Sequence, residues 1–205
     1  MRKLVIGLAA SFLAATSAHA VTFITSPIGS APAAGATVIN FDSATPAGFN
    51  VTGGTIQSGN NNIGHEPVAG DGNYLTTNIS SGTGSASIFS TVGYNQISFD
   101  WGSIDTYNRF ALLDQNGTAV FTLSGNDVSP HNGVDGLRIT LTADAGDGPF
   151  YGIRFYSDQP AFEVDNVAFN AAVPEPATWA MMIGGFGLIG GAMRLRSRKP
   201  AFVSA

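Results

Sequence analysis

Cysteine is absent from this chain of 205 residues. Disulfide bonds, thiolate nucleophiles and cysteine-bound zinc are therefore excluded, and a folded domain must rely on a buried apolar core. Positive charge is almost absent from the middle of the chain, since residues 21–172 contain three arginines and no lysine against thirteen acidic residues, a net charge of −10. Nucleic acids and anionic membranes need a basic face, so this segment predicts no nucleic-acid partner.

Histidine is rare as well. Beyond residue 20 there are only His65 and His131, and neither belongs to an HExxH pattern. Each is interpreted as a loop residue rather than a general base, and no GxSxG sequence is present. The acidic residues lie mostly in turn-like settings that single out no glycosidase pair, so a glycoside hydrolase is the third-ranked hypothesis. The sequence predicts a protein that is not an enzyme.

The N-terminus has the pattern of a secretory signal peptide. A basic start at Arg2 and Lys3 precedes an apolar run from Leu4 to Ala15, and Ala18 and Ala20 form a small-x-small cleavage pattern. Residues 1–20 are therefore predicted to be removed by signal peptidase after Ala20. The run is shorter than a membrane span, and an uncleaved anchor is the alternative.

The C-terminus contains a second apolar run. Residues 177–193 carry no charge, and a basic end at residues 194–199 follows with Arg194, Arg196, Arg198 and Lys199. Seventeen helical residues reach about 26 Å, at the short end of what crosses a bilayer. We expect a transmembrane helix whose basic end faces the cytoplasm, with the acidic body on the other side of the inner membrane.

A proline corner precedes this run. Pro174, Glu175 and Pro176, followed by Trp179 and the Arg-rich end, resemble the PEP-CTERM sorting signal of Gram-negative bacteria over about the last 30 residues, 173–205. The resemblance implies that exosortase, a membrane-embedded processing enzyme, recognises Pro174, Glu175 and Pro176, and that the protein reaches the cell surface or an extracellular matrix of biofilm and exopolysaccharide. Tails of this kind also carry an ice-binding protein label, which implies no ice activity. An ordinary membrane anchor with a small-residue packing face is the alternative.

The body, residues 21–172, has the composition of a β-protein. Short alternating runs separated by turn signals predict about nine or ten antiparallel strands in two packed sheets, a β-sandwich of jelly-roll type. In one run Ile97, Phe99 and Trp101 should share the core face while Ser98 and Asp100 point away. Hairpins are expected at residues 109–123 and at residues 151–169.

The final predicted strand, with the sequence Phe-Glu-Val-Asp-Asn-Val at residues 162–167, resembles the closing strand of exported jelly-roll domains, including carbohydrate-binding modules. In such domains the first and last strands are often neighbours, and the resemblance makes Asp42 and Asp165, with Asp71 as a third, candidate ligands of a structural calcium ion. Calcium needs six to eight oxygens, so no cofactor is certain. The alternative is that Asp42 and Asp165 are turn or edge residues that accept hydrogen bonds from nearby backbone N–H groups.

Two functions remain open for the body. The first is an exported surface or matrix protein without enzymatic activity. The second is a carbohydrate-binding module delivered by the same route, for which Tyr94 and Tyr107 are the candidate sugar contacts because both are expected in loops beside Trp101. Trp101 itself is interpreted as a core residue, since it shares the parity of Ile97 and Phe99.

Overall fold

The computed structural model of the chain describes residues 20–70, 72–78, 82, 84–128, 136–144, 146–171 and 176–196. Its contacts divide the chain into two compact units, Met1–Ala171 and Ala172–Ala205, which we describe separately. The predicted signal peptide lies outside the described residues except for Ala20.

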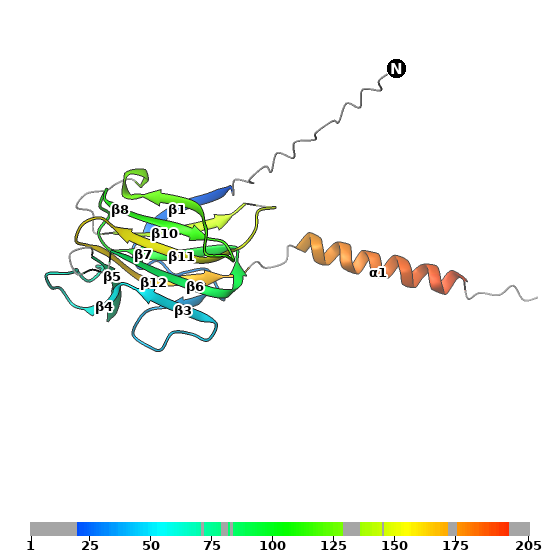
Figure 1. Cartoon of the computed structure of the whole chain (residues 1–205). Helices are drawn as coiled ribbons and strands as arrows, with labels where there is room; N and C mark the ends of the chain where they lie inside the picture. The colour runs from blue at the N-terminus through cyan, green and yellow to red at the C-terminus, as the bar shows by residue number, and fades with distance from the viewer. Residues whose placement is uncertain are drawn as a thin grey trace, which may run out of the picture. The chain divides into compact units, whose positions relative to one another are not determined.

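The first unit, called the body from here on, is an all-β structure, as the sequence predicts (Figure 1). Its described residues form twelve strands, two more than the upper estimate from the sequence, and one short 3-10 helix at Gly125–Asp127. The strands are β1 (Val21–Pro27), β2 (Thr37–Ile39), β3 (Phe49–Gly53), β4 (Thr55–Ser58), β5 (Asn73–Thr77), β6 (Ser85–Tyr94), β7 (Gln96–Trp101), β8 (Asn108–Leu113), β9 (Ala119–Ser124), β10 (Leu137–Ala143), β11 (Phe150–Ser157) and β12 (Phe162–Asn170).

The strands form two antiparallel sheets. One has the order β1-β10-β7-β12-β5-β4, with β2 also paired to β12, and the other has the order β3-β6-β11-β8-β9. From β5 onward the pairing is nested, because β5 pairs with β12, β6 with β11, β7 with β10 and β8 with β9. The two antiparallel sheets confirm the coarse fold prediction, whereas the jelly-roll type stays a prediction.

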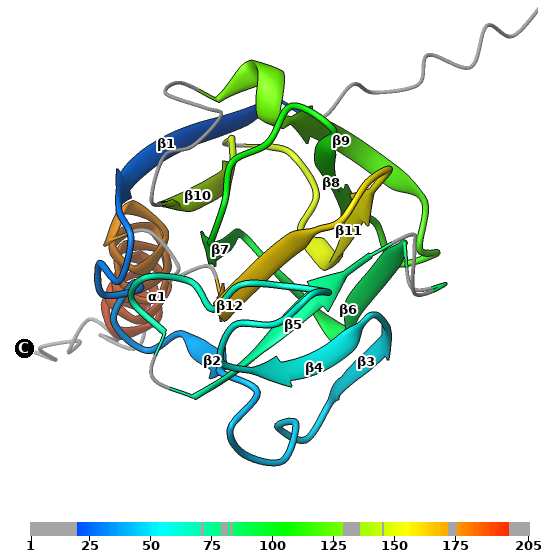
Figure 2. The ribbon, with the colours of Figure 1, turned by 90° about the vertical axis from the view of Figure 1, so that its left-hand side faces the viewer.

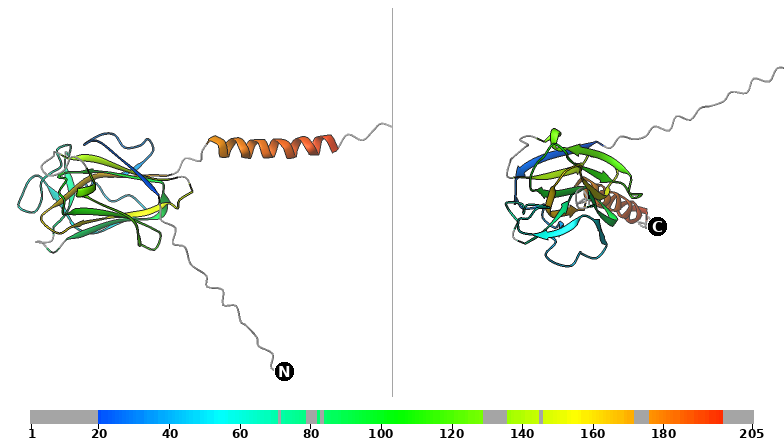
Figure 3. Two further views of the ribbon diagram at one scale, coloured as in Figure 1. Left: turned by 90° about the horizontal axis from the view of Figure 1, so that it is seen from above. Right: turned by 60° about the vertical axis from the view of Figure 1, so that its left-hand side comes forward.

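The apolar faces of the two sheets share one core. Phe99 on β7 lies 5.1 Å, between ring centroids, from both Phe110 on β8 and Phe155 on β11, which belong to the opposite sheet. All three rings are fully buried. Figures 2 and 3 show the strands of the two sheets enclosing the interior of the body. Because this core and every described strand pairing lie within the body, the body has what it needs to fold without the C-terminal unit.

The predicted alternation of β7 is confirmed on its core face. Ile97, Phe99 and Trp101 are fully buried in the core. Asp100 and Ser98 point to the other face of the sheet, as expected, but they are buried as well, at 1% and 3% exposed. Polar side chains on the outer face of this sheet are therefore also shielded from solvent, and the alternation of the sequence alone does not reveal this.

Of the two hairpins predicted from the sequence, one is present in the structure and the other is not. The predicted hairpin at residues 109–123 is present as β8 and β9, and Asp114 Oδ1 accepts hydrogen bonds from the N–H groups of Asn116 and Thr118 in its turn. The prediction of a hairpin at residues 151–169 is wrong, because β11 and β12 belong to different sheets. A turn between two alternating strands is compatible both with pairing and with a crossing from one sheet to the other, and the shared core favours the crossing here.

The second unit contains the helix α1 (Pro176–Arg196). Apolar side chains are exposed along it, including Met181, Phe186 and Leu188. Within the described residues, however, no helix is long and apolar enough to cross a membrane. The predicted transmembrane helix at 177–193 is therefore not supported. Five of its seventeen residues are glycines, which add almost no apolar surface.

Candidate functional site

The structure places the candidate calcium ligands in backbone hydrogen bonds. Asp42 Oδ1 accepts a hydrogen bond of 2.6 Å from the N–H of Asn73 at the start of β5. Asp165, buried on β12, accepts one of 2.6 Å from the N–H of Asn166. These contacts fit the alternative interpretation of both residues. Asp71 lies outside the described residues, and within the described ranges no three His, Cys, Asp or Glu side chains cluster as metal ligands. A calcium site stays a prediction.

The two tyrosines predicted to contact sugar lie in different environments. Tyr94 ends β6 and packs on the core, with its ring centroid 5.7 Å from that of Phe49 and 5.3 Å from that of Phe169. Tyr107 lies between β7 and β8, and its hydroxyl donates to Asp105 Oδ2 at 2.9 Å. Burial and this hydrogen bond raise the pKa of Tyr107 well above its ordinary value. Both residues are half-buried, and Tyr94 belongs to a strand rather than to the expected loop.

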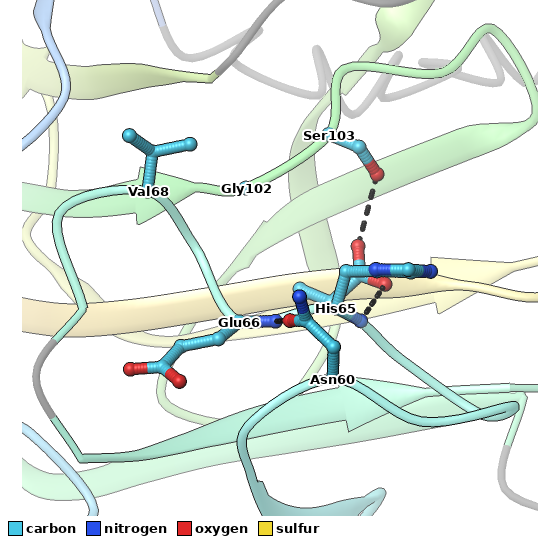
Figure 4. Close-up of a pocket in the computed structure, with 7 residues that line it drawn as sticks. Asn60, His65, Glu66, Val68, Gly102 and Ser103 are labelled. Atoms are coloured by element: carbon cyan, nitrogen blue, oxygen red, sulfur yellow. Dashed lines mark hydrogen bonds between the residues drawn. The ribbon is translucent and has the colours of Figure 1, made fainter.

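A pocket of about 250 Å³ lies instead over the outer face of the first sheet (Figure 4). We call it the Glu163 pocket. The connection between β4 and β5 forms one wall, and the end of β7 and the start of β12 form the other. Its lining residues are Asn60, His65, Glu66, Val68, Gly102, Ser103 and Glu163. A second pocket of about 160 Å³, the adjoining pocket, shares His65 and Glu163 with it; its other lining residues are Asn61, Asn62, Ile63, Gly64, Pro160 and Ala161.

Glu163 is the buried acid of this site, only 2% exposed. Its position on β12 follows from strand alternation, since its neighbours Phe162 and Val164 face the core. Burial raises the pKa of Glu163 above its ordinary 4.5, while hydrogen bonds from the His65 N–H and the Ser103 hydroxyl partly oppose this rise. The carboxyl group therefore holds a proton more strongly than an exposed glutamate does.

Ser103 links this carboxyl group to a second one. Its Oγ lies 2.9 Å from Glu163 Oε2 and 3.1 Å from Asp105 Oδ2. One hydroxyl proton cannot serve two carboxylates. The Ser103 hydroxyl is placed to donate to either carboxylate, so it ties the two acidic groups together.

The wall formed by the β4–β5 connection is held by side chains of β5. The hydroxyl of Tyr74 donates to the Gly59 carbonyl at 2.9 Å, and the hydroxyl of Thr76 donates to the Ile63 carbonyl at 3.3 Å. The N–H of His65 is bonded to Glu163 Oε1 at 3.0 Å. Burial, together with the charges of Glu163 and Glu66, raises the pKa of Tyr74 to about 12, so its hydroxyl keeps its proton across the physiological range.

The residues of the Glu163 pocket form no recognisable pattern in the sequence. Glu163, Ser103 and His65 come from three distant parts of the chain, and no motif connects them. One signal was available: Glu163 is a carboxylate at an interior position of a strand whose neighbouring residues are apolar. Glutamate is almost never fully buried unless it is paired, so such a position indicates a polar partner over the sheet.

The sorting motif falls largely outside the described residues. Pro174 and Glu175 are not among them, whereas Pro176 begins α1 and Trp179 lies within it. A proline at the first helical position is favourable, because its missing N–H has no partner there in any case. Of the basic residues, Arg194 and Arg196 lie in the last turn of α1, and Arg198 and Lys199 lie outside the described part of the chain.

Comparison with known proteins identifies the tail alone. No curated protein matches the chain. Among solved structures, it is similar to the enzymatically active domain of tailspike protein 4 of bacteriophage CBA120, with 14% sequence identity and a TM-score of 0.32. That likeness covers 65% of this chain and 20% of the tailspike chain, and it is too slight to support an argument. The ice-binding label and the resemblance to carbohydrate-binding modules stay unconfirmed.

Residues 172–199 match the family described as the PEP-CTERM protein-sorting motif. The match confirms the resemblance drawn from the proline corner and the basic end. The motif in this C-terminal segment implies an exported protein that is sorted in an exosortase-dependent way and handled at the membrane.

Proposed function

We propose that the chain is a surface or matrix protein without enzymatic activity, delivered to an extracellular layer of biofilm or exopolysaccharide after exosortase has processed its tail. The observation that carries the proposal is the sorting-motif match at residues 172–199. In this proposal signal peptidase removes residues 1–20, and the body passes from the inner membrane to the cell surface.

The body has properties that suit such a location. Its core is built from both sheets and needs no disulfide, so folding depends on no oxidising enzyme. Its net charge of −10 over residues 21–172 keeps it soluble and away from anionic membrane surfaces. Neither feature requires catalysis. The buried carboxyl group of Glu163 accepts a hydrogen bond from the His65 N–H, and this bond holds the wall of the pocket in place.

Processing is tested by measuring the intact mass of the mature protein from its natural host. We expect a species that begins after Ala20 and ends near Pro174, and a heavier species in a strain without exosortase. The variant Pro174→Ala/Glu175→Ala should accumulate in the heavier form. Peptides from the body, such as the one that contains Arg138, should have the same mass in the variant and in the wild type. A mature protein that retains residues 177–199 in the exosortase-positive strain would overturn the proposal.

The absence of catalysis is tested separately on purified residues 21–171. Incubation with a panel of polysaccharides should release no reducing sugar above the level seen with the variant Glu163→Gln. Release by the wild-type body that is lost in this variant would reassign the protein as a glycoside hydrolase.

A further inference from the structure

The Glu163 pocket and the adjoining pocket are neighbouring hollows that together make a polar depression with two compartments. Both are lined by His65 and Glu163, so the two hollows meet at these residues. Their volumes of about 250 and 160 Å³ together reach the lower part of the range of about 300–1,000 Å³ that is typical of small-molecule sites. A ligand with two linked units of similar size would place one unit in each hollow.

The walls of this depression are held in place by their own hydrogen bonds. In addition to the bonds of Tyr74 and Thr76, the amide of Asn78 donates to the Ile63 carbonyl at 3.1 Å, and Asn60 Oδ1 accepts from the Glu66 N–H at 2.8 Å. A site whose walls are already ordered loses little conformational entropy when a ligand binds. This arrangement distinguishes the depression from a gap under a loose loop.

The polar groups that remain open define the chemistry of the ligand. The imidazole of His65 is exposed, and Asn60 and Glu66 reach the same hollow (Figure 4). These side chains offer hydrogen-bond donors and acceptors together, which hydroxyl groups match because each hydroxyl both donates and accepts. Among the described residues that line the two pockets there is no lysine or arginine, whereas Glu66 and Glu163 are present. Phosphates, sulfates and uronates would meet negative charge there.

We propose that the two pockets bind an uncharged saccharide chain, with one sugar unit on each side of His65 and Glu163. This inference rests on the proposed function only in that the body must reach a compartment that contains glycans. Glu163 acts as a positioning residue, since its carboxyl group holds the His65 backbone, and the His65 imidazole contacts the sugar. Val68, which is 69% exposed at the rim, supplies an apolar contact for the ring.

The test uses residues 21–171 and isothermal titration with neutral tetrasaccharides of gluco, manno and galacto configuration. Tetragalacturonate serves as the anionic probe. At least one neutral probe should bind, while tetragalacturonate should not. The variant His65→Ala removes an exposed side chain and keeps the backbone N–H that bonds Glu163, so it should keep the unfolding temperature. It should weaken binding about fivefold or more, the equivalent of one hydrogen bond.

The matched control is Asn50→Ala, an exposed position on β3 in the other sheet, which should bind as the wild type does. Absence of binding to every neutral probe, a preference for tetragalacturonate, or equal affinity of His65→Ala and wild type would each overturn the inference. Because the tail is not part of the protein tested, a failure here leaves the processing experiment untouched, and a failure of processing leaves this result untouched.

Discussion

Arg138 and Asp100 form an ion pair inside the body, with Nη1 of the guanidinium 3.0 Å from Oδ1 of the carboxylate and both side chains 2% exposed. The two residues are direct partners in the register of β10 and β7. Asp165 on β12 is the next residue in the same row, opposite Asp100. The amide of Asn166 bonds Asp100 Oδ2 at 3.1 Å, so this polar row joins three strands on the outer face of the sheet.

Breaking this pair should destabilise the body strongly. The variant Asp100→Asn leaves the Arg138 charge buried without its counter-ion, a change that costs about 3–5 kcal/mol in comparable sites. Urea unfolding of residues 21–171 followed by circular dichroism measures the loss. The control is Asp158→Asn, which breaks the ion pair with Arg109 on the surface, where the side chains are 42% and 58% exposed. That variant should cost about 1 kcal/mol or less; equal losses in both variants would contradict the buried pairing.

Protonation of Glu163 should appear in the pH dependence of stability. Between pH 4.5 and its raised pKa, the folded body holds a proton on Glu163 that the unfolded chain has released. The free energy of unfolding therefore falls as the pH rises through this window and is level above it. The glutamine side chain of the variant Glu163→Gln cannot ionise. As the pH rises through this window, the free energy of unfolding of the variant should therefore increase relative to that of the wild type. Parallel curves from urea unfolding between pH 4 and pH 8 would refute this assignment.

Phe99 should be among the most costly core positions. Its ring contacts those of Trp101, Phe110 and Phe155, so Phe99→Ala leaves a cavity between the sheets and should cost about 3–5 kcal/mol. The matched control is Phe23→Ala on β1, where the side chain is 37% exposed. Thermal unfolding of both variants provides the comparison. A similar loss of stability at both positions would contradict the placement of Phe99 in the core between the two sheets.

Gly72 and Asp42 should be energetically coupled. A Cβ at position 72 would lie 2.7 Å from Cγ of Asp42, so Gly72→Ala must displace the carboxylate that accepts from the Asn73 N–H. The single variant should cost about 0.5–1.5 kcal/mol, the net contribution of a typical hydrogen bond, because Asp42 is exposed. In an Asp42→Ala background the same change should cost much less. A double-mutant cycle by urea unfolding measures this coupling, and additive losses would count against it.

The amount that sequence could predict differs between the two units. The proline corner, Trp179 and the basic end form a local pattern within 26 residues, so the sorting motif is readable without any structure. The all-β class and the core face of β7 also follow from local alternation, because strand geometry places every second side chain on the same side. The hairpin predicted at residues 151–169 failed, since alternation does not say which sheet a strand joins.

The sequence by itself therefore determined that the protein is exported and sorted through its tail, and that its body is made of strands, because these properties depend on patterns between near neighbours in the chain. Only the tertiary structure decided that Asp100 and Arg138 pair inside the body, and that His65, Ser103 and Glu163 meet at one pocket. The strand pairing brings His65 and Glu163, which are 98 positions apart in the chain, into hydrogen-bonding distance. Contacts of this kind arise from strand register and crossings between sheets, which leave no local pattern in the chain.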